Sequence, residues 1–141
     1  MAAAFDLDRF VAAQRDVYAQ ALAELREGRK RSHWMWFVFP QIAGLGVSPT
    51  ARFYAIGSGG EARAYLAHSL LGPRLGDCTE AMLRHRGRTA ESVLGAVDAI
   101  KLRSSMTLFE AVAEDRGLFG EALLVFYGGA RDGATLELLA G

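Results

Sequence analysis

The sequence predicts an all-α fold in a single domain, and two patterns support this prediction. Apolar residues recur at the three- and four-residue spacing of helix faces through most of the chain, and no segment alternates as a half-buried strand does. The 141 residues, 51% hydrophobic and 23% charged, have the length and composition of one globular domain. We therefore expect residues 1–141 to form a compact bundle of seven or eight short to medium helices.

The first predicted helix is the longest continuous apolar pattern near the N-terminus. Phe10 and Leu25 belong to one apolar face whose members repeat with helical spacing. Asp6 or Asp8 is suited to begin this helix, and Gly28 is suited to end it. The pattern thus predicts a single helix from Asp6 or Asp8 to the residue before Gly28.

A strongly apolar stretch, residues 34–39, follows a basic segment. It is too apolar for a surface loop, and Pro40 should end any regular element there. We interpret it as a short buried helix, with a strand as the alternative. The stretch is far shorter than the roughly 20 residues that cross a bilayer as a helix. Beyond it, Pro49 is suited to the first position of the next helix.

Residues that favour helix ends delimit the rest of the chain. Ser58 and Glu61 have the spacing of a capping box, and Thr89, Asp98 and Asp132 are suited to helix N-caps. The predicted spans, with their caps or opening prolines included, are 58–69, 73–86, 89–95, 98–114, 118–127 and 132–139.

Charge and cysteine content exclude several classes of protein. The 16 basic and 16 acidic residues cancel, so no long-range field favours nucleic acid or an acidic membrane, and we expect neither as a partner. Cys78 is the single cysteine, which fits a reducing compartment. Asp6 and Asp8 lie where a secretory signal needs apolar residues. We expect a cytoplasmic protein, and the absence of a metal or dinucleotide motif predicts no cofactor.

Polar residues turn toward the core on the predicted helix 98–114. At about 100° per residue, Asp98, Lys101 and Ser105 point within roughly 60° of the apolar side that contains Leu102. An unpaired buried charge costs several kcal/mol, so Lys101 needs a partner, and Asp98 lies three residues earlier. One interpretation is a structural Lys101–Asp98 pair, with the Ser105 hydroxyl bonded to its own helix.

The other interpretation is a functional pocket for an anion or a hydroxyl. Lys101 then supplies charge, Ser105 hydrogen-bonds the ligand, and Arg103 closes the pocket from its rim. In an enzyme, Asp98, Lys101 and Ser105 are the candidate catalytic residues.

A second cluster contains the two tryptophans. Trp34 and Trp36 are suited to core packing, which is the commoner role of such residues. His33 and Gln41, however, bracket the stretch with hydrogen-bonding groups, and an indole face stacks well on a nucleobase, flavin or sugar. These four residues are therefore candidate ligand-binding residues.

The basic segment 26–31 precedes these aromatic residues. It is suited to hold a phosphate or a single-stranded nucleic acid. The zero net charge favours the alternative, in which its arginines complement the negative end of the first helix.

The sequence closely resembles a bacterial family of domains of unknown function, family 1810. The residues that carry the resemblance lie in segments 31–41, 44–46, 54–56, 61–68, 74–75 and 98–109, and the match runs from about 6 to 139. The resemblance implies an all-helical fold and supplies no activity. Family members often carry the label calpastatin, which we reject because calpastatin's inhibitory segments are disordered and polar. The Gly-rich segment 127–132 departs from the family pattern, with Asp132 at the expected acidic position.

The order of motifs along the chain, a Trp-rich segment followed by a lysine and then an acidic residue near the end, is more distantly similar to another group of proteins. These are small helical proteins that cleave N-glycosidic bonds in riboflavin precursors or ADP-ribosyl groups. This likeness transfers no catalytic residue. The candidate residues themselves indicate a pocket for a phosphorylated or nucleotide-like molecule, in which an indole stacks on the ligand and Lys101 holds its anion. If the protein is an enzyme, N-glycosidic hydrolysis is the reaction to test first, with Asp98 or Asp132 polarising water. The alternative is a non-catalytic protein-interaction module in which the polar cluster is structural. The oligomeric state is not predicted.

Overall fold

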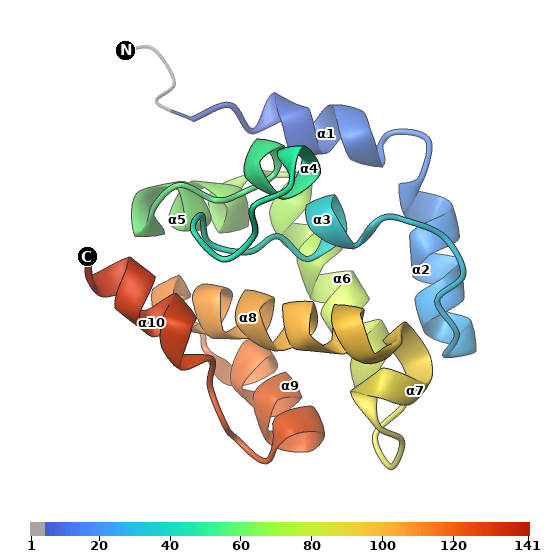
Figure 1. The fold of residues 1–141 in the computed structure, drawn as a ribbon. Coiled ribbons are helices and arrows are strands. Elements are labelled where there is room, and N and C mark those ends of the chain that lie inside the picture. Colours follow the sequence, from blue (N-terminus) through green and yellow to red (C-terminus); the bar gives the residue numbers. More distant parts are fainter. Residues whose placement is uncertain (1–4) are drawn as a thin grey trace.

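The computed structural model describes residues 5–141, which contain ten helices and no strand (Figure 1). The all-α prediction is confirmed, and the number of helices exceeds the seven or eight expected. Within the described range, no helix has both the length and the apolar character needed to cross a membrane. The helices are α1 (Asp8–Gln14), α2 (Tyr18–Glu27), α3 (Met35–Val38), α4 (Pro49–Phe53), α5 (Gly59–Ala67), α6 (Leu71–Leu83), α7 (Ala90–Leu94), α8 (Ala96–Val112), α9 (Gly117–Tyr127) and α10 (Gly133–Ala140).

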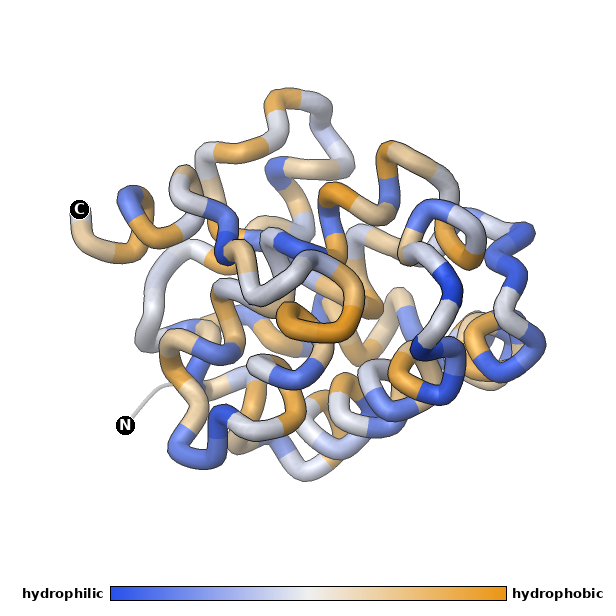
Figure 2. The backbone as a smooth tube through the Cα atoms, turned by 90° about the horizontal axis from the view of Figure 1, so that it is seen from below, coloured by the Kyte–Doolittle hydropathy of each residue, from blue (hydrophilic) through white to orange (hydrophobic). Residues whose placement is uncertain are grey.

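Two long helices organise the bundle. α8 packs against α5, α7, α9 and α10, and α6 packs against α2, α3, α5 and α9. Hydrophobic and hydrophilic residues are interleaved along the helices, so each can turn an apolar face inward (Figure 2). Trp34, Tyr65 and Phe109 are among the largest fully buried side chains. The short helix predicted within residues 34–39 is present as α3, and its strand alternative is wrong.

The single N-terminal helix predicted up to Gly28 is wrong, because the chain turns at residues 15–17 and forms α1 and α2. The side chain of Gln14, at the end of α1, is buried and donates to Phe37 O at 2.7 Å and to the hydroxyl of Tyr65 at 3.3 Å. These bonds fix the end of α1 on α3 and α5, so α2 can take a new direction toward α6. The end of α2 at Gly28 is as predicted.

Four of the predicted helix starts, those of α4, α5, α7 and α10, have side-chain caps. Two differ: α6 begins at Leu71, ahead of Pro73, and α8 begins at Ala96. Asp98 is therefore in the first turn of α8 and is not its cap. Gly95 takes the N-cap position with φ 89°, a conformation that favours glycine. The confirmed caps are Ser58, Thr89 and Asp132, which accept from the backbone N–H groups of Glu61, Ser92 and Thr135. Ser48, which was not predicted as a cap, accepts from Ala51 N at the start of α4.

Replacing Gly28 by alanine should destabilise the protein more than the same change at Gly87. Both glycines have positive φ, 79° and 98°, so each alanine loses about 1 kcal/mol or more from backbone strain. A Cβ at Gly28 would also lie 2.8 Å from Cε1 of the His85 ring, which is held on Leu25 O, whereas Gly87 faces open space. Urea unfolding of both variants measures the difference, and equal midpoints would contradict the close contact at Gly28.

Candidate functional site

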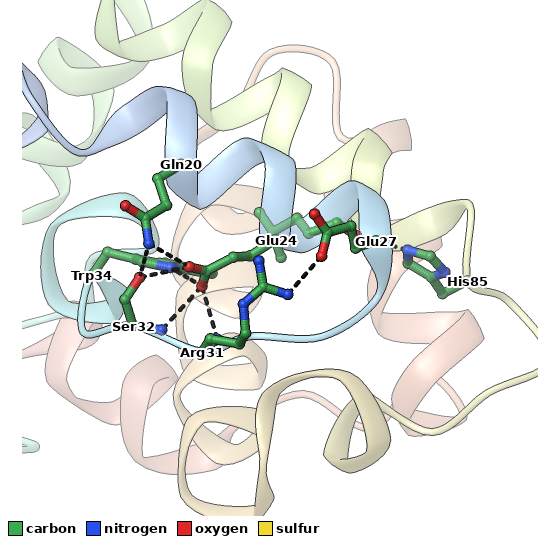
Figure 3. Close-up of polar contacts among 8 residues, drawn as sticks. Gln20, Glu24, Glu27, Arg31, Ser32, Trp34 and His85 are labelled. Carbon is green, nitrogen blue, oxygen red and sulfur yellow. Dashed lines mark hydrogen bonds and ion pairs between the residues drawn. The ribbon is translucent and has the colours of Figure 1, made fainter.

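A buried carboxylate fixes the segment that precedes the two tryptophans (Figure 3). Glu24, on α2, is 0% exposed. Its Oε1 accepts hydrogen bonds from Arg31 N at 2.8 Å, Ser32 N at 3.1 Å and Trp34 Nε1 at 3.0 Å. Its Oε2 accepts from Ser32 Oγ at 2.7 Å and from Gln20 Nε2 at 3.0 Å. One carboxylate thus holds the backbone of residues 31–32 and orients the indole that follows.

These hydrogen bonds also keep Glu24 ionised. Burial alone raises the pKa of a carboxyl group, but the bonds from Arg31 N, Trp34, Ser32 and Gln20 outweigh burial and lower the pKa of Glu24 well below its ordinary value. Glu24 is not among the site residues that the sequence predicts. Its place three residues after Ala21, on the face that α2 buries, was the available indication.

The loop held by Glu24 brings a second lysine to the predicted ion pair. Lys101 Nζ lies 3.1 Å from Asp98 Oδ1, which confirms that pair, and Lys30 Nζ lies 2.8 Å from Asp98 Oδ2. The three side chains, which we term the charged row, are poorly exposed: Lys30 9%, Asp98 16% and Lys101 18%. Two ammonium groups and one carboxylate leave one positive charge in surroundings with little water.

Each ammonium of the charged row also faces an indole ring. Lys30 Nζ lies 5.1 Å from the ring centroid of Trp34, and Lys101 Nζ lies 3.9 Å from that of Trp36. Both distances are in the range of cation–π attraction. Burial raises the pKa of Asp98, but hydrogen bonds and charge from Lys30 and Lys101 lower it below its ordinary value. Asp98 is therefore an ionised bridge between the two lysines.

A groove of about 290 Å³ opens beside the charged row at Trp36. We term it the Trp36 groove. The half-buried indole also lines an adjoining cavity of about 150 Å³. Gln41 and Gly46 likewise line both the groove and this cavity. The groove is lined by Trp36, Gln41, Leu45, Gly46, Val97, Ile100, Lys101, Ser104 and Asp132. Predicted residues Trp36, Gln41 and Lys101 therefore meet at one place, together with Asp132.

Ser105 does not join them, and Ser104 takes its place. Ser105 is buried, and its Oγ has no hydrogen-bond partner among residues 5–141, so the bond to its own helix is also absent. Ser104 lines the groove, and its Oγ donates to Asp132 Oδ2 at 3.0 Å. The helical projection identified the inward side of α8 correctly, but the groove lies on the side shared by Lys101 and Ser104.

Three other predicted residues lie outside the groove. Trp34 is fully buried with its ring nitrogen bound to the buried carboxylate, so its indole has no face free for a ligand. His33 is exposed and does not line the groove. Arg103 donates to Ala130 O and Arg131 O, both at 2.8 Å. It thereby fastens the loop before α10 and does not close the Trp36 groove.

Asp132 combines a helix cap with a position in the groove. Its Oδ2 accepts from Thr135 N at 3.2 Å and from the hydroxyls of Thr135 and Ser104, and its own N–H donates to Thr107 Oγ1 at 3.0 Å. These bonds fix the carboxylate between α8 and α10. Within residues 5–141, no group of three or more His, Cys, Asp or Glu side chains is placed to hold a metal ion.

Comparison with known proteins confirms the resemblance found in the sequence. Residues 4–139 match the model of a family described as "Protein of unknown function (DUF1810)". The fold is similar to the crystal structure of the conserved hypothetical protein Rv1873 from Mycobacterium tuberculosis, with 52% sequence identity and a TM-score of 0.95. That similarity covers 97% of this chain and 98% of the mycobacterial one. No curated protein matches the chain.

Glu24→Gln should lower the free energy of unfolding by about 2–4 kcal/mol, because it replaces a charged acceptor of buried N–H groups by a neutral amide. Glu27→Gln is the matched control on the same helix: its side chain is 53% exposed and pairs with Arg31 at the surface. The control should change stability little. Urea unfolding followed by tryptophan fluorescence compares the variants, and equal losses would show that the buried carboxylate has no special role.

The advantage of the wild type over Glu24→Gln should depend on pH. The folded-state pKa of Glu24 lies below its ordinary value of 4.5, so its stabilisation is complete above that value and declines as pH falls through it. The decline is at most about 1.4 kcal/mol per pH unit. Unfolding curves at neutral pH and at about pH 3 measure the difference. A constant difference between the two proteins would contradict the lowered pKa.

Proposed function

The chain belongs to the family of proteins of unknown function DUF1810, and we propose that it binds a small anionic ligand with a flat ring in the Trp36 groove. The ligand class is phosphorylated or nucleotide-like. The observation that carries the proposal is the unbalanced charged row next to a half-buried indole at the groove wall.

The charge of the row supports an anionic ligand. Asp98 is shared by two ammonium groups, each of which is less than one-fifth exposed. An anion beside Lys101 would balance the remaining positive charge, and poor exposure strengthens such an interaction because little water screens it. Lys101 is the member of the row that lines the groove, so it is the residue proposed to contact the anion.

The surroundings of Trp36 support a flat ring. The indole is a wall of both the groove and the adjoining cavity, and stacking on it would not depend on a particular ring. Gln41 lines the same two spaces, and its amide offers both donors and an acceptor to the edge of a heterocycle. Gly46, which lines both spaces, lets its backbone approach α4 closely, since a Cβ there would lie 2.6 Å from Ala51 Cβ.

The reaction we propose to test is hydrolysis of an N-glycosidic bond. Water would add to the anomeric carbon, the C–N bond would break, and the base would leave with a proton. Asp132 is better suited than Asp98 to polarise that water, because Asp98 is already held between two ammonium groups and Asp132 lines the groove.

One observation favours a second function, that of a protein-interaction module. Val97 and Ile100 at the groove are each 67% exposed, which is high for large aliphatic side chains. A partner protein would cover them. This alternative predicts that no small molecule tested stabilises the protein.

Lys101→Met should remove ligand binding while leaving the free protein nearly as stable, because the remaining Lys30–Asp98 pair is balanced. Trp36→Leu should weaken binding about tenfold or more through lost stacking. Arg116→Met, at an exposed position outside the groove, is the control. Thermal-shift assays with nucleotides, NAD, ADP-ribose and flavin precursors provide the measurement; a ligand at 100 times its Kd stabilises by about 2.7 kcal/mol.

No shift with any of these molecules would favour the interaction module. Equal shifts in the wild type and Lys101→Met would contradict the role of the charged row even if a ligand binds.

Asp132→Asn should retain the fold and the ligand and lower hydrolysis by at least about 100-fold, the usual contribution of a general base. Asparagine serves as an N-cap about as well as aspartate, so α10 should still form. Chromatography of the released base measures turnover by both proteins. Unchanged turnover would exclude Asp132 as the residue that polarises water, without affecting the binding proposal.

A further inference from the structure

Exposed arginines gather away from the Trp36 groove, where the end of α2 meets the turn between α6 and α7. Three come from the end of α2 and the loop after it, and three come from the turn. All six are exposed. This set, which we term the arginine corner, consists of Arg26, Arg29, Arg31, Arg84, Arg86 and Arg88.

Two contacts bring these distant segments together. The ring of His85 donates from Nε2 to Leu25 O, with the two atoms 2.7 Å apart (Figure 3). Gly28 has no side chain to separate the segments: a Cβ there would meet Arg88 Nη1 and lie 2.8 Å from Cε1 of His85. The fold therefore makes one surface from two arginine-rich segments that are far apart in the sequence.

Only two of the six arginines of the corner form an ion pair in the described part of the chain, although Glu80 lines the same surface hollow as Arg84 and Arg86. Arg31 pairs with Glu27, and Arg86 pairs with Glu121. The other four arginines of the corner form no ion pair within residues 5–141. The carboxyl end of a helix carries only about half a negative charge, so the end of α2 does not account for four unpaired guanidinium groups.

We propose that the arginine corner binds an acidic segment of a partner protein. Guanidinium groups bind carboxylates through two parallel hydrogen bonds, and arginine clusters recognise acidic motifs in this way. A nucleic acid fits less well. Segments 26–31 and 84–88 contain no Phe, Tyr or Trp on which bases could stack.

Fluorescence anisotropy with a labelled peptide of eight glutamates, at about 50 mM salt, tests the proposal. The variant Arg26→Gln/Arg84→Gln removes one charge from each segment and should weaken binding about tenfold. The control Arg15→Gln/Arg116→Gln removes two exposed arginines that form no ion pair within residues 5–141. It should bind nearly as the wild type does, and thermal midpoints of both variants verify the fold.

Three results would overturn the proposal. The peptide fails to bind the wild type, both double variants lose affinity equally, or a single strand of eight thymidines binds more tightly than the peptide. The last result would identify the corner as a nucleic-acid surface.

Discussion

The rest of the structure depends on the buried carboxylate of Glu24. A charge removed from water is tolerated only when hydrogen bonds replace its hydration, and five donors from α2 and residues 31–34 do so. The same bonds set the path of the chain between α2 and α3. They fix Trp34 in the core, directly before the helix that carries Trp36, and they bring Lys30 against the first turn of α8. The charged row and the groove beside it follow from that path.

Features fixed within a few residues were predictable from the sequence. The N-caps depend on a side chain and an N–H three residues later, so Thr89 at α7 and Asp132 at α10 were identified correctly. The Lys101–Asp98 pair was predictable for the same reason, since its members are three residues apart on one helix. The family resemblance supported the fold but provided no role for any residue.

Features that depend on packing between elements were not predictable. The side-chain amide of Gln14 fastens the end of α1 to Phe37 and Tyr65, which no local pattern reveals. The choice of Ser105 over Ser104 failed because a helical projection gives the inward side of α8 without saying which neighbouring elements line a groove. Lys30 was missed for a similar reason, since it meets α8 only through the fold of the preceding loop.

Hydrogen exchange of the two indole N–H groups, followed by NMR and assigned with Trp36→Phe, tests the role of Glu24 most directly. If Glu24 holds the loop, the N–H of Trp34 is strongly protected in the wild type and loses that protection in Glu24→Gln. The N–H of Trp36 should exchange similarly in both proteins. Protection of Trp34 that is unchanged by the substitution would show that the loop is held by other contacts, and the account of the site would fail with it.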